Sequence, residues 1–161
     1  MAKIGDAIIY YSKQLNVNHQ IIAAIVWQES RCEPYAMRFE PGFYAKYVKD
    51  TTYAKLQGFL PPSQVVTQET ERKARATSWG LMQIMGQVAR EEGFKELYLA
   101  ELVDIETNIR FGAKHFSKLL DAVNGKIDAA LLRWNGGGNK DYPAQVLNHI
   151  DTGDYQAVYV R

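Results

Sequence analysis

Apolar residues recur at steps of three and four along most of this 161-residue chain, and sustained alternation of apolar and polar residues is scarce. The first pattern is typical of amphipathic helices and the second of strands, so the sequence predicts a mainly α fold. A further helix, over 67–75, is predicted from a polar run and would be exposed. The other helices are predicted from the apolar pattern, over about 6–15, 18–30, 79–92, 104–123, 128–134 and 142–150.

Three stretches lack a helical pattern. Prolines and glycines interrupt residues 37–76, which predicts short helices and loops. The run Asn-Gly-Gly-Gly-Asn at 135–139 is too rich in glycine for a helix or a strand and predicts a loop. The residues after Ile150 carry no pattern that assigns them to an element.

Length and composition favour one domain over residues 1–161, because the chain is long enough for one hydrophobic core and too short for two ordinary domains. The net charge of +1 gives no whole-chain reason to bind nucleic acid or anionic lipid. Cys32 is the only cysteine, so an internal disulfide is impossible. No apolar run reaches the roughly 18 residues of a membrane span, and the first residues do not resemble a signal peptide. We expect a soluble monomer that does not insert into a membrane.

Glu29 is the first candidate for chemistry, because the predicted helix 18–30 is otherwise apolar on nearly every side. Burial and the negative end of the helix dipole should both raise the pKa of Glu29. A carboxyl group that stays neutral near working pH can protonate a leaving-group oxygen. The alternative is structural: Glu29 points outward or pairs with Arg31.

Two further runs could line a binding groove. In Gly-Leu-Met-Gln-Ile-Met at 80–85, the glycine permits close approach of a ligand and Gln83 places an amide among apolar neighbours. In Trp-Asn-Gly-Gly-Gly at 134–138, an aromatic ring that could stack on a sugar precedes a flexible polar turn. Each run alone is equally compatible with an ordinary core or turn.

We expect no metal and no other cofactor. His19, His115 and His149 lie far apart in the sequence and show no ligand spacing. No glycine-rich phosphate loop follows a strand, which removes the usual nucleotide-binding interpretations.

Taken in order, these motifs resemble those of the soluble lytic transglycosylases and the related goose-type lysozymes. The resemblance covers about residues 18–150. It rests on Glu-Ser at 29–30, Gly-Leu-Met-Gln-Ile-Met at 80–85, Asn-Ile at 108–109 followed by Gly-Ala at 112–113, and Ala-Ala-Leu-Leu-Arg-Trp-Asn-Gly-Gly at 129–137.

The resemblance implies a lysozyme-like α domain with a glycan-binding cleft. Its partner would be a peptidoglycan strand, cut between N-acetylmuramic acid and N-acetylglucosamine at the cell wall. Glu29 would be the sole catalytic carboxylate, first as acid and then as base towards the sugar's own C6 hydroxyl, so that a 1,6-anhydro ring forms without water. Ser30, Met82, Gln83 and Trp134 would line the substrate groove, and Asn135 would lie near the leaving sugar.

The chain departs from the family pattern in two places. Trp134 stands where the family usually has tyrosine, which removes a phenolic hydroxyl that could bond to the acid. Residues 37–76 form a long insertion, since Glu29 and Gly80 are 51 positions apart. Within it, the run 38–44 looks like a stretch found in some bacteriophage cell-wall enzymes, which suggests a phage or prophage origin.

Two other functions remain open. A hydrolytic muramidase would cut the same bond with water held by a second carboxylate. The candidates for this carboxylate are Glu33, Glu40, Asp50, Glu69 and Glu71. Among them we single out Glu71, which lies nine positions before Gly80, as the possible second carboxylate. A non-catalytic glycan-binding module is the third possibility, although Glu29 and Gln83 would then have no evident purpose.

Overall fold

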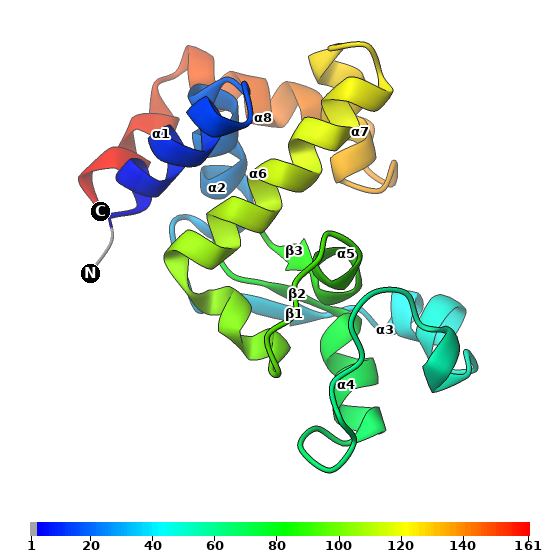
Figure 1. Cartoon of the computed structure of the whole chain (residues 1–161). Coiled ribbons are helices and arrows are strands. Elements are labelled where there is room, and N and C mark those ends of the chain that lie inside the picture. The colour runs from blue at the N-terminus through cyan, green and yellow to red at the C-terminus, as the bar shows by residue number, and fades with distance from the viewer. Residues whose placement is uncertain (1–2) are drawn as a thin grey trace.

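The computed structural model describes residues 3–161, which form a mainly helical domain with one small sheet (Figure 1). Helices α1 (Ile4–Gln14), α2 (His19–Ser30), α6 (Ile105–Ala122), α7 (Ile127–Trp134) and α8 (Tyr142–Asp151) make one part of it. The sheet and helices α3 (Pro41–Phe43), α4 (Gln68–Arg75) and α5 (Gly86–Glu91) make the other. The mainly α fold predicted from the sequence is therefore confirmed.

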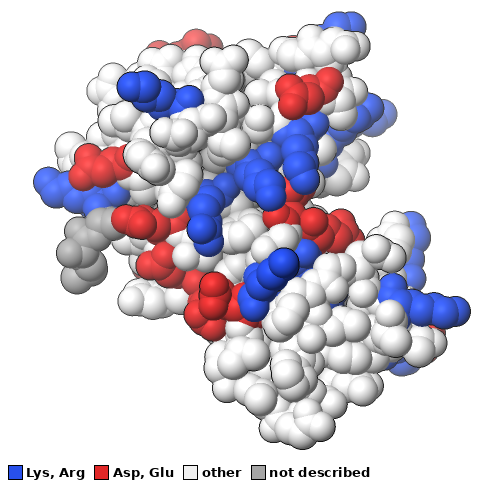
Figure 2. Space-filling model, in the orientation of Figure 1, with Lys and Arg blue, Asp and Glu red and all other residues white. Residues whose placement is uncertain are grey.

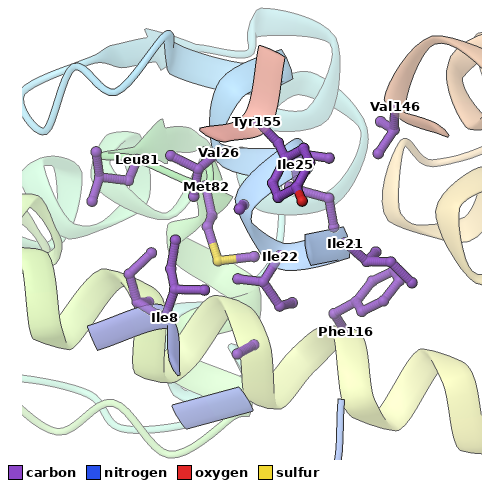
Figure 3. Close-up of a cluster of buried hydrophobic side chains, with 14 of the residues drawn as sticks. Ile8, Ile21, Ile22, Ile25, Val26, Leu81, Met82, Phe116, Val146 and Tyr155 are labelled. Atoms are coloured by element: carbon purple, nitrogen blue, oxygen red, sulfur yellow. The ribbon is translucent and has the colours of Figure 1, made fainter. Parts of the chain in front are cut away.

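Helix α2 lies at the centre of the larger part, and this explains why it is apolar on almost every side. Six consecutive residues, Ile21 to Val26, are at most 3% exposed. Asn18 caps the helix by accepting a hydrogen bond from the Gln20 amide at 2.9 Å. Figure 3 shows side chains from α1, α6, α8 and the C-terminal segment gathered around this helix.

The chain after α8 ends in a 3-10 helix, Asp154–Val160, which packs against α1 and α2. Tyr155 and Val158 enter the core from it. The sequence pattern did not assign this segment, because a 3-10 helix does not follow the 3.6-residue period of an α-helix.

The predicted helix over 79–92 is wrong over its first half. Its first half is a hairpin in which β2 (Thr77–Trp79) pairs antiparallel with β3 (Ile84–Met85), and only Gly86–Glu91 is helical, as α5. Positive φ angles at Gly80 (68°) and Gln83 (49°) exclude a continuous helix here. The sequence did not indicate strand β2, because all three of its residues are buried and it therefore shows no alternation of apolar and polar positions.

The segment 37–76 supplies the third strand. Strand β1 (Met37–Phe39) pairs antiparallel with β2, giving the sheet order β1-β2-β3. After α3 the chain forms a π-helical turn (Tyr44–Val48), a 3-10 turn (Tyr53–Lys55) and then α4. The predicted helix over 67–75 is confirmed, but it is not wholly exposed, because Glu71 and Arg75 are at most 1% exposed.

The charged side chains are unevenly placed despite the small net charge. Figure 2 shows Lys and Arg side chains gathered in a band over α6, beside acidic residues. Within this region Lys118 and Lys114 lie 2.5 Å and 3.8 Å from the Glu92 carboxylate. Part of the positive charge is therefore neutralised locally.

Candidate active site

Glu29 lies in the last turn of α2, next to the residue that hydrogen-bonds this helix to the β2–β3 hairpin. Ser30 makes this attachment, because its hydroxyl donates to the carbonyl of Leu81 at 2.8 Å and to that of Val26 at 3.2 Å. Arg31 then adopts a left-handed conformation with φ of 51°, which ends the helix. The Glu29 carboxyl group is thus carried by a buried helix with a fixed end.

Tyr142 is the direct partner of Glu29. Its hydroxyl donates a hydrogen bond to Oε1 of Glu29 at 2.5 Å. Burial raises the pKa of Tyr142, and the adjacent carboxylate raises it further, so the phenol stays protonated and remains a donor. The first turn of α8 therefore supplies a phenolic hydroxyl to the Glu29 carboxyl group.

The pKa of Glu29 is raised, mainly because burial disfavours the charged carboxylate. The Tyr142 hydroxyl, the Trp134 indole and the positive charge of Arg38 act in the opposite direction, but they do not cancel the effect of burial. The direction agrees with the prediction from the sequence, although the contact with Tyr142 and the influence of Arg38 were not foreseen. A carboxyl group in this setting can donate a proton and then accept one.

Glu29 lines a pocket of about 430 Å³ that lies between the two parts of the domain. Residues from the sheet and from α3 form one side, including Arg38, Phe43 and Ser78. Residues from α6, α7 and the loop that follows form the other side, including His115 and Gly136. The size and the mixture of aromatic and polar groups suit an organic ligand.

Of the site residues predicted from the sequence, Gln83, Trp134 and Asn135 line this pocket together with Glu29. Ser30 and Met82 do not. Ser30 holds the helix end, and Met82 is completely buried beneath the wall, with its sulfur against Gly112.

A buried asparagine, Asn108, fixes the conformation of the Gly-Leu-Met-Gln run by hydrogen bonds. Asn108 accepts a hydrogen bond from the Met82 amide at 2.8 Å and donates to the carbonyls of Trp79 and Leu102 at 2.8 and 2.7 Å. A Cβ atom on Gly80 would overlap the Asn108 side chain, so this position requires glycine in addition to its positive φ. The three bonds hold the hairpin against α6.

Gln83 serves the hairpin as well as the pocket. Its amide nitrogen donates to the carbonyls of Ala36 and Gly80 at 3.0 and 2.9 Å. These bonds orient the side chain and leave its amide oxygen without a hydrogen-bond partner among residues 3–161. The oxygen is the part of the group that a ligand can use as an acceptor.

Trp134 and Asn135 lie on the opposite side of the pocket. The Trp134 ring packs against Phe116 and His115, with ring centroids 6.1 and 5.7 Å apart. The side-chain oxygen of Asn135 accepts the Asn139 amide at 2.8 Å, which fixes the glycine-rich loop. His115 in turn lies 3.2 Å from the Glu92 carboxylate, so the rings on this side are held in place.

The structure does not bring Glu71 to Glu29. The Glu71 carboxylate is 1% exposed and accepts hydrogen bonds from Arg75 at 2.9 Å and from Arg90 at 2.8 Å. Glu33, Asp50 and Glu69 are not among the pocket's lining residues either. Glu40 is the one acidic residue, besides Glu29, that lines the pocket.

Glu40 is bound to Arg38, whose Nε atom lies 2.5 Å from its Oε1 atom. Arg38, whose positive charge lowers the pKa of Glu29, is therefore paired with a second carboxylate that lines the same pocket. The sequence included Glu40 among five candidates but gave no means of choosing it, and it did not indicate Tyr142, Arg38 or His115. Tyr142 shows only as an apolar position at the start of a helix, which is the usual pattern of a core residue.

Among residues 3–161, no group of three or more His, Cys, Asp or Glu side chains could hold a metal ion. In the same range, no helix is long and apolar enough to cross a membrane.

In this pocket one carboxyl group with a raised pKa lies among amide and aromatic side chains, an arrangement that can supply a proton to a bound ligand. The model of the transglycosylase SLT domain family matches residues 6–148, and the chain belongs to that family. It is thus a member of the lysozyme-like superfamily that acts on peptidoglycan. Searches of curated proteins and of solved structures returned no match.

Proposed function

We propose that the protein is a lytic transglycosylase that cleaves the β-1,4 bond from N-acetylmuramic acid to N-acetylglucosamine and leaves 1,6-anhydro-N-acetylmuramic acid ends. The observation that carries this proposal is Glu29, a carboxyl group with a raised pKa that lines the pocket and is held by Tyr142. The matching family supports peptidoglycan as the substrate.

In the first step Glu29 donates its proton to the bridging oxygen, and the bond from this oxygen to C1 of the muramyl sugar breaks. Tyr142 donates its hydrogen bond to Oε1, so in this proposal Oε1 would be the carbonyl oxygen of the neutral acid and Oε2 would carry the transferable proton. The leaving N-acetylglucosamine departs with a free 4-hydroxyl group.

In the second step the Glu29 carboxylate removes the proton from the C6 hydroxyl of the muramyl sugar, and the C6 oxygen bonds to C1. Glu29 returns to its neutral form, so one residue serves as acid and base and no water is consumed. Gln83, through its free amide oxygen, and the Trp134 ring would position the sugars.

A hydrolytic muramidase is the second candidate, and the observation that favours it is the presence of Glu40 in the pocket. Glu40 would have to hold a water molecule opposite Glu29. Its bond to Arg38 speaks for the transglycosylase, because this bond occupies one of the carboxylate oxygens.

Digestion of purified peptidoglycan in oxygen-18 water, followed by mass spectrometry, distinguishes the two reactions. Ring closure incorporates no label and gives products that borohydride does not reduce, whereas hydrolysis places one labelled atom at each new reducing end. We expect unlabelled anhydro products from the wild type and from Glu40→Gln. Labelled products that disappear in Glu40→Gln would assign the protein as a muramidase with Glu40 as its second carboxylate.

The remaining expectations belong to the same proposal. The protein would act as a monomer at the cell wall, and a phage or prophage origin would explain the run 38–44. Neighbouring genes for a holin or a tail protein would support that origin, and genes of bacterial cell-wall turnover would speak against it.

A further inference from the structure

A second pocket of about 330 Å³ adjoins the Glu29 pocket and shares Phe43 and Val88 with it. Residues between 43 and 57 form one wall, and α5 forms the other. The first wall lies in the segment 37–76, and the proposed reaction assigns no purpose to the residues of this wall beyond Phe43. In Figure 1 it is the cyan region beside α3.

The surface that lines this second pocket is largely apolar. Leu56 is 7% exposed and closes its inner side. The Phe43 and Tyr47 rings pack with centroids 5.0 Å apart, and the Thr51 hydroxyl donates to the Tyr47 carbonyl at 2.9 Å. These contacts hold the aromatic wall in place without a ligand.

Two charged residues of opposite sign, Lys55 and Glu91, also line the second pocket. Both are exposed, and neither forms an ion pair within the described part of the chain. Glu91 is nevertheless fixed, because Gln87 donates to its carboxylate at 2.8 Å. Gln87 in turn accepts from Arg75 at 2.9 Å, so the carboxylate is anchored to the buried Glu71 cluster.

We propose that the second pocket binds the stem peptide of the peptidoglycan unit whose sugars occupy the Glu29 pocket. This inference rests on the proposed function. The glycan sugars carry no charge once the muramyl carboxyl group is joined to the peptide, so they have no use for Lys55 or Glu91. A stem peptide has carboxylates for Lys55, an ammonium group for Glu91 when it contains a diamino acid, and methyl side chains for the apolar walls.

The continuity of the two pockets supports this assignment. The peptide is covalently attached to the muramyl sugar, so a site for it must lie next to the site for that sugar. Phe43 and Val88 contribute to both pockets and provide this adjacency.

The test compares two substrates: intact peptidoglycan, and the same glycan after an amidase has removed its stem peptides. The variants are Lys55→Glu and Glu91→Lys, with Lys49→Glu as the matched control, because Lys49 is exposed and lines neither pocket. We expect Lys55→Glu and Glu91→Lys to lower kcat/KM on intact peptidoglycan by about threefold to tenfold, since reversal replaces a modest attraction by repulsion. On stripped glycan both should equal the wild type.

Equal losses on both substrates would mean that the pocket holds a sugar, and no loss on either would mean that it holds nothing. Both results overturn the inference while leaving the proposed function intact. A wild type that cleaved neither substrate would overturn the proposed function and the inference with it.

Direct binding gives a second measurement that does not depend on cleavage. Free tetrapeptide released from the same wall is titrated calorimetrically into Glu29→Gln, with and without Lys55→Glu or Lys49→Glu. Binding should be weakened by Lys55→Glu alone. Absence of binding to Glu29→Gln at millimolar peptide would contradict the inference.

Discussion

The hydroxyl of Tyr142 and Oε1 of Glu29 are joined by a 2.5 Å hydrogen bond across 113 positions of the sequence. Because α8 packs directly on α2, the bond joins two elements of the main core. It stabilises the charged form of Glu29 relative to the neutral form, while burial has the opposite and larger effect. The pKa of the acid is thus set by two opposing contributions that can be changed separately.

Tyr142→Phe removes the contribution that lowers the pKa of Glu29. The pKa should rise further, and since Glu29 must be protonated to act as the acid, the decline of kcat/KM at high pH should move to higher pH. The maximal rate should fall about tenfold or more, because a hydrogen bond to a charged group contributes about 1.5–3 kcal/mol. The measurement is a pH profile of peptidoglycan clearing.

Tyr155→Phe is the matched control for that profile. Tyr155 is also a buried tyrosine, and its hydroxyl accepts a hydrogen bond from Gln20 at 2.8 Å rather than contacting Glu29. Its profile should coincide with that of the wild type. A shift of the Tyr142→Phe profile to lower pH would contradict the role given to this hydroxyl.

Glu29→Gln should abolish clearing and make the protein more stable at neutral pH. The pKa of Glu29 is raised from 4.5 in the folded state, so folding is favoured when the group is protonated. As pH rises from 4.5 through the folded pKa, the wild type loses stability that the glutamine variant keeps. Urea unfolding of both proteins from about pH 4 to about pH 8 measures this difference.

The stability advantage of Glu29→Gln should therefore grow with pH and then level off. A constant difference across the series would show that the pKa of Glu29 is not raised by folding. Residual clearing above a few per cent of the wild-type rate would remove Glu29 from the catalytic role.

Glu71→Gln should destabilise the fold strongly without changing the type of product. Glu71 pairs with Arg75 and Arg90, and all three side chains are at most 1% exposed. Breaking a buried ion pair by removing one partner costs about 3–5 kcal/mol.

Glu69→Gln is the control on the same helix, because Glu69 pairs with the exposed Lys73. This substitution should lower the free energy of unfolding by at most about 1 kcal/mol. Similar unfolding midpoints for the two variants would show that the buried cluster does not hold the fold together.

The helices and the catalytic candidate could be predicted because their signals are local. Each signal lies within a few turns of one helix: the buried face of α6, its Asp104 cap and the apolar residues around Glu29. The β2–β3 hairpin could not be predicted in this way, since its strands are short and β2 depends on pairing with β1, about 40 positions away in the chain. Tyr142 and Glu40 were not selected for the same reason: only the fold brings Tyr142 into contact with Glu29 and Glu40 into the same pocket.

Gln83 has two roles that single substitutions can separate, because it supports the hairpin with its amide nitrogen and presents its amide oxygen to the pocket. Gln83→Ala removes both hydrogen bonds of the nitrogen, at about 1 kcal/mol each. Gln83→Gly removes the same bonds but suits the positive φ of 49°, which costs an alanine roughly 1–2 kcal/mol. Chemical denaturation should therefore rank the wild type above Gln83→Gly and Gln83→Ala lowest.

The activities of the same two variants decide whether the amide contacts the glycan. If it does, both should lose kcat/KM to a similar extent, about tenfold for one lost hydrogen bond to the substrate, although their stabilities differ. If Gln83 serves the hairpin alone, activity should follow stability, and Gln83→Gly should be the more active variant. Full activity in folded Gln83→Gly would leave the amide oxygen without a part in catalysis, and the sugars would then be positioned from the Trp134 side of the pocket.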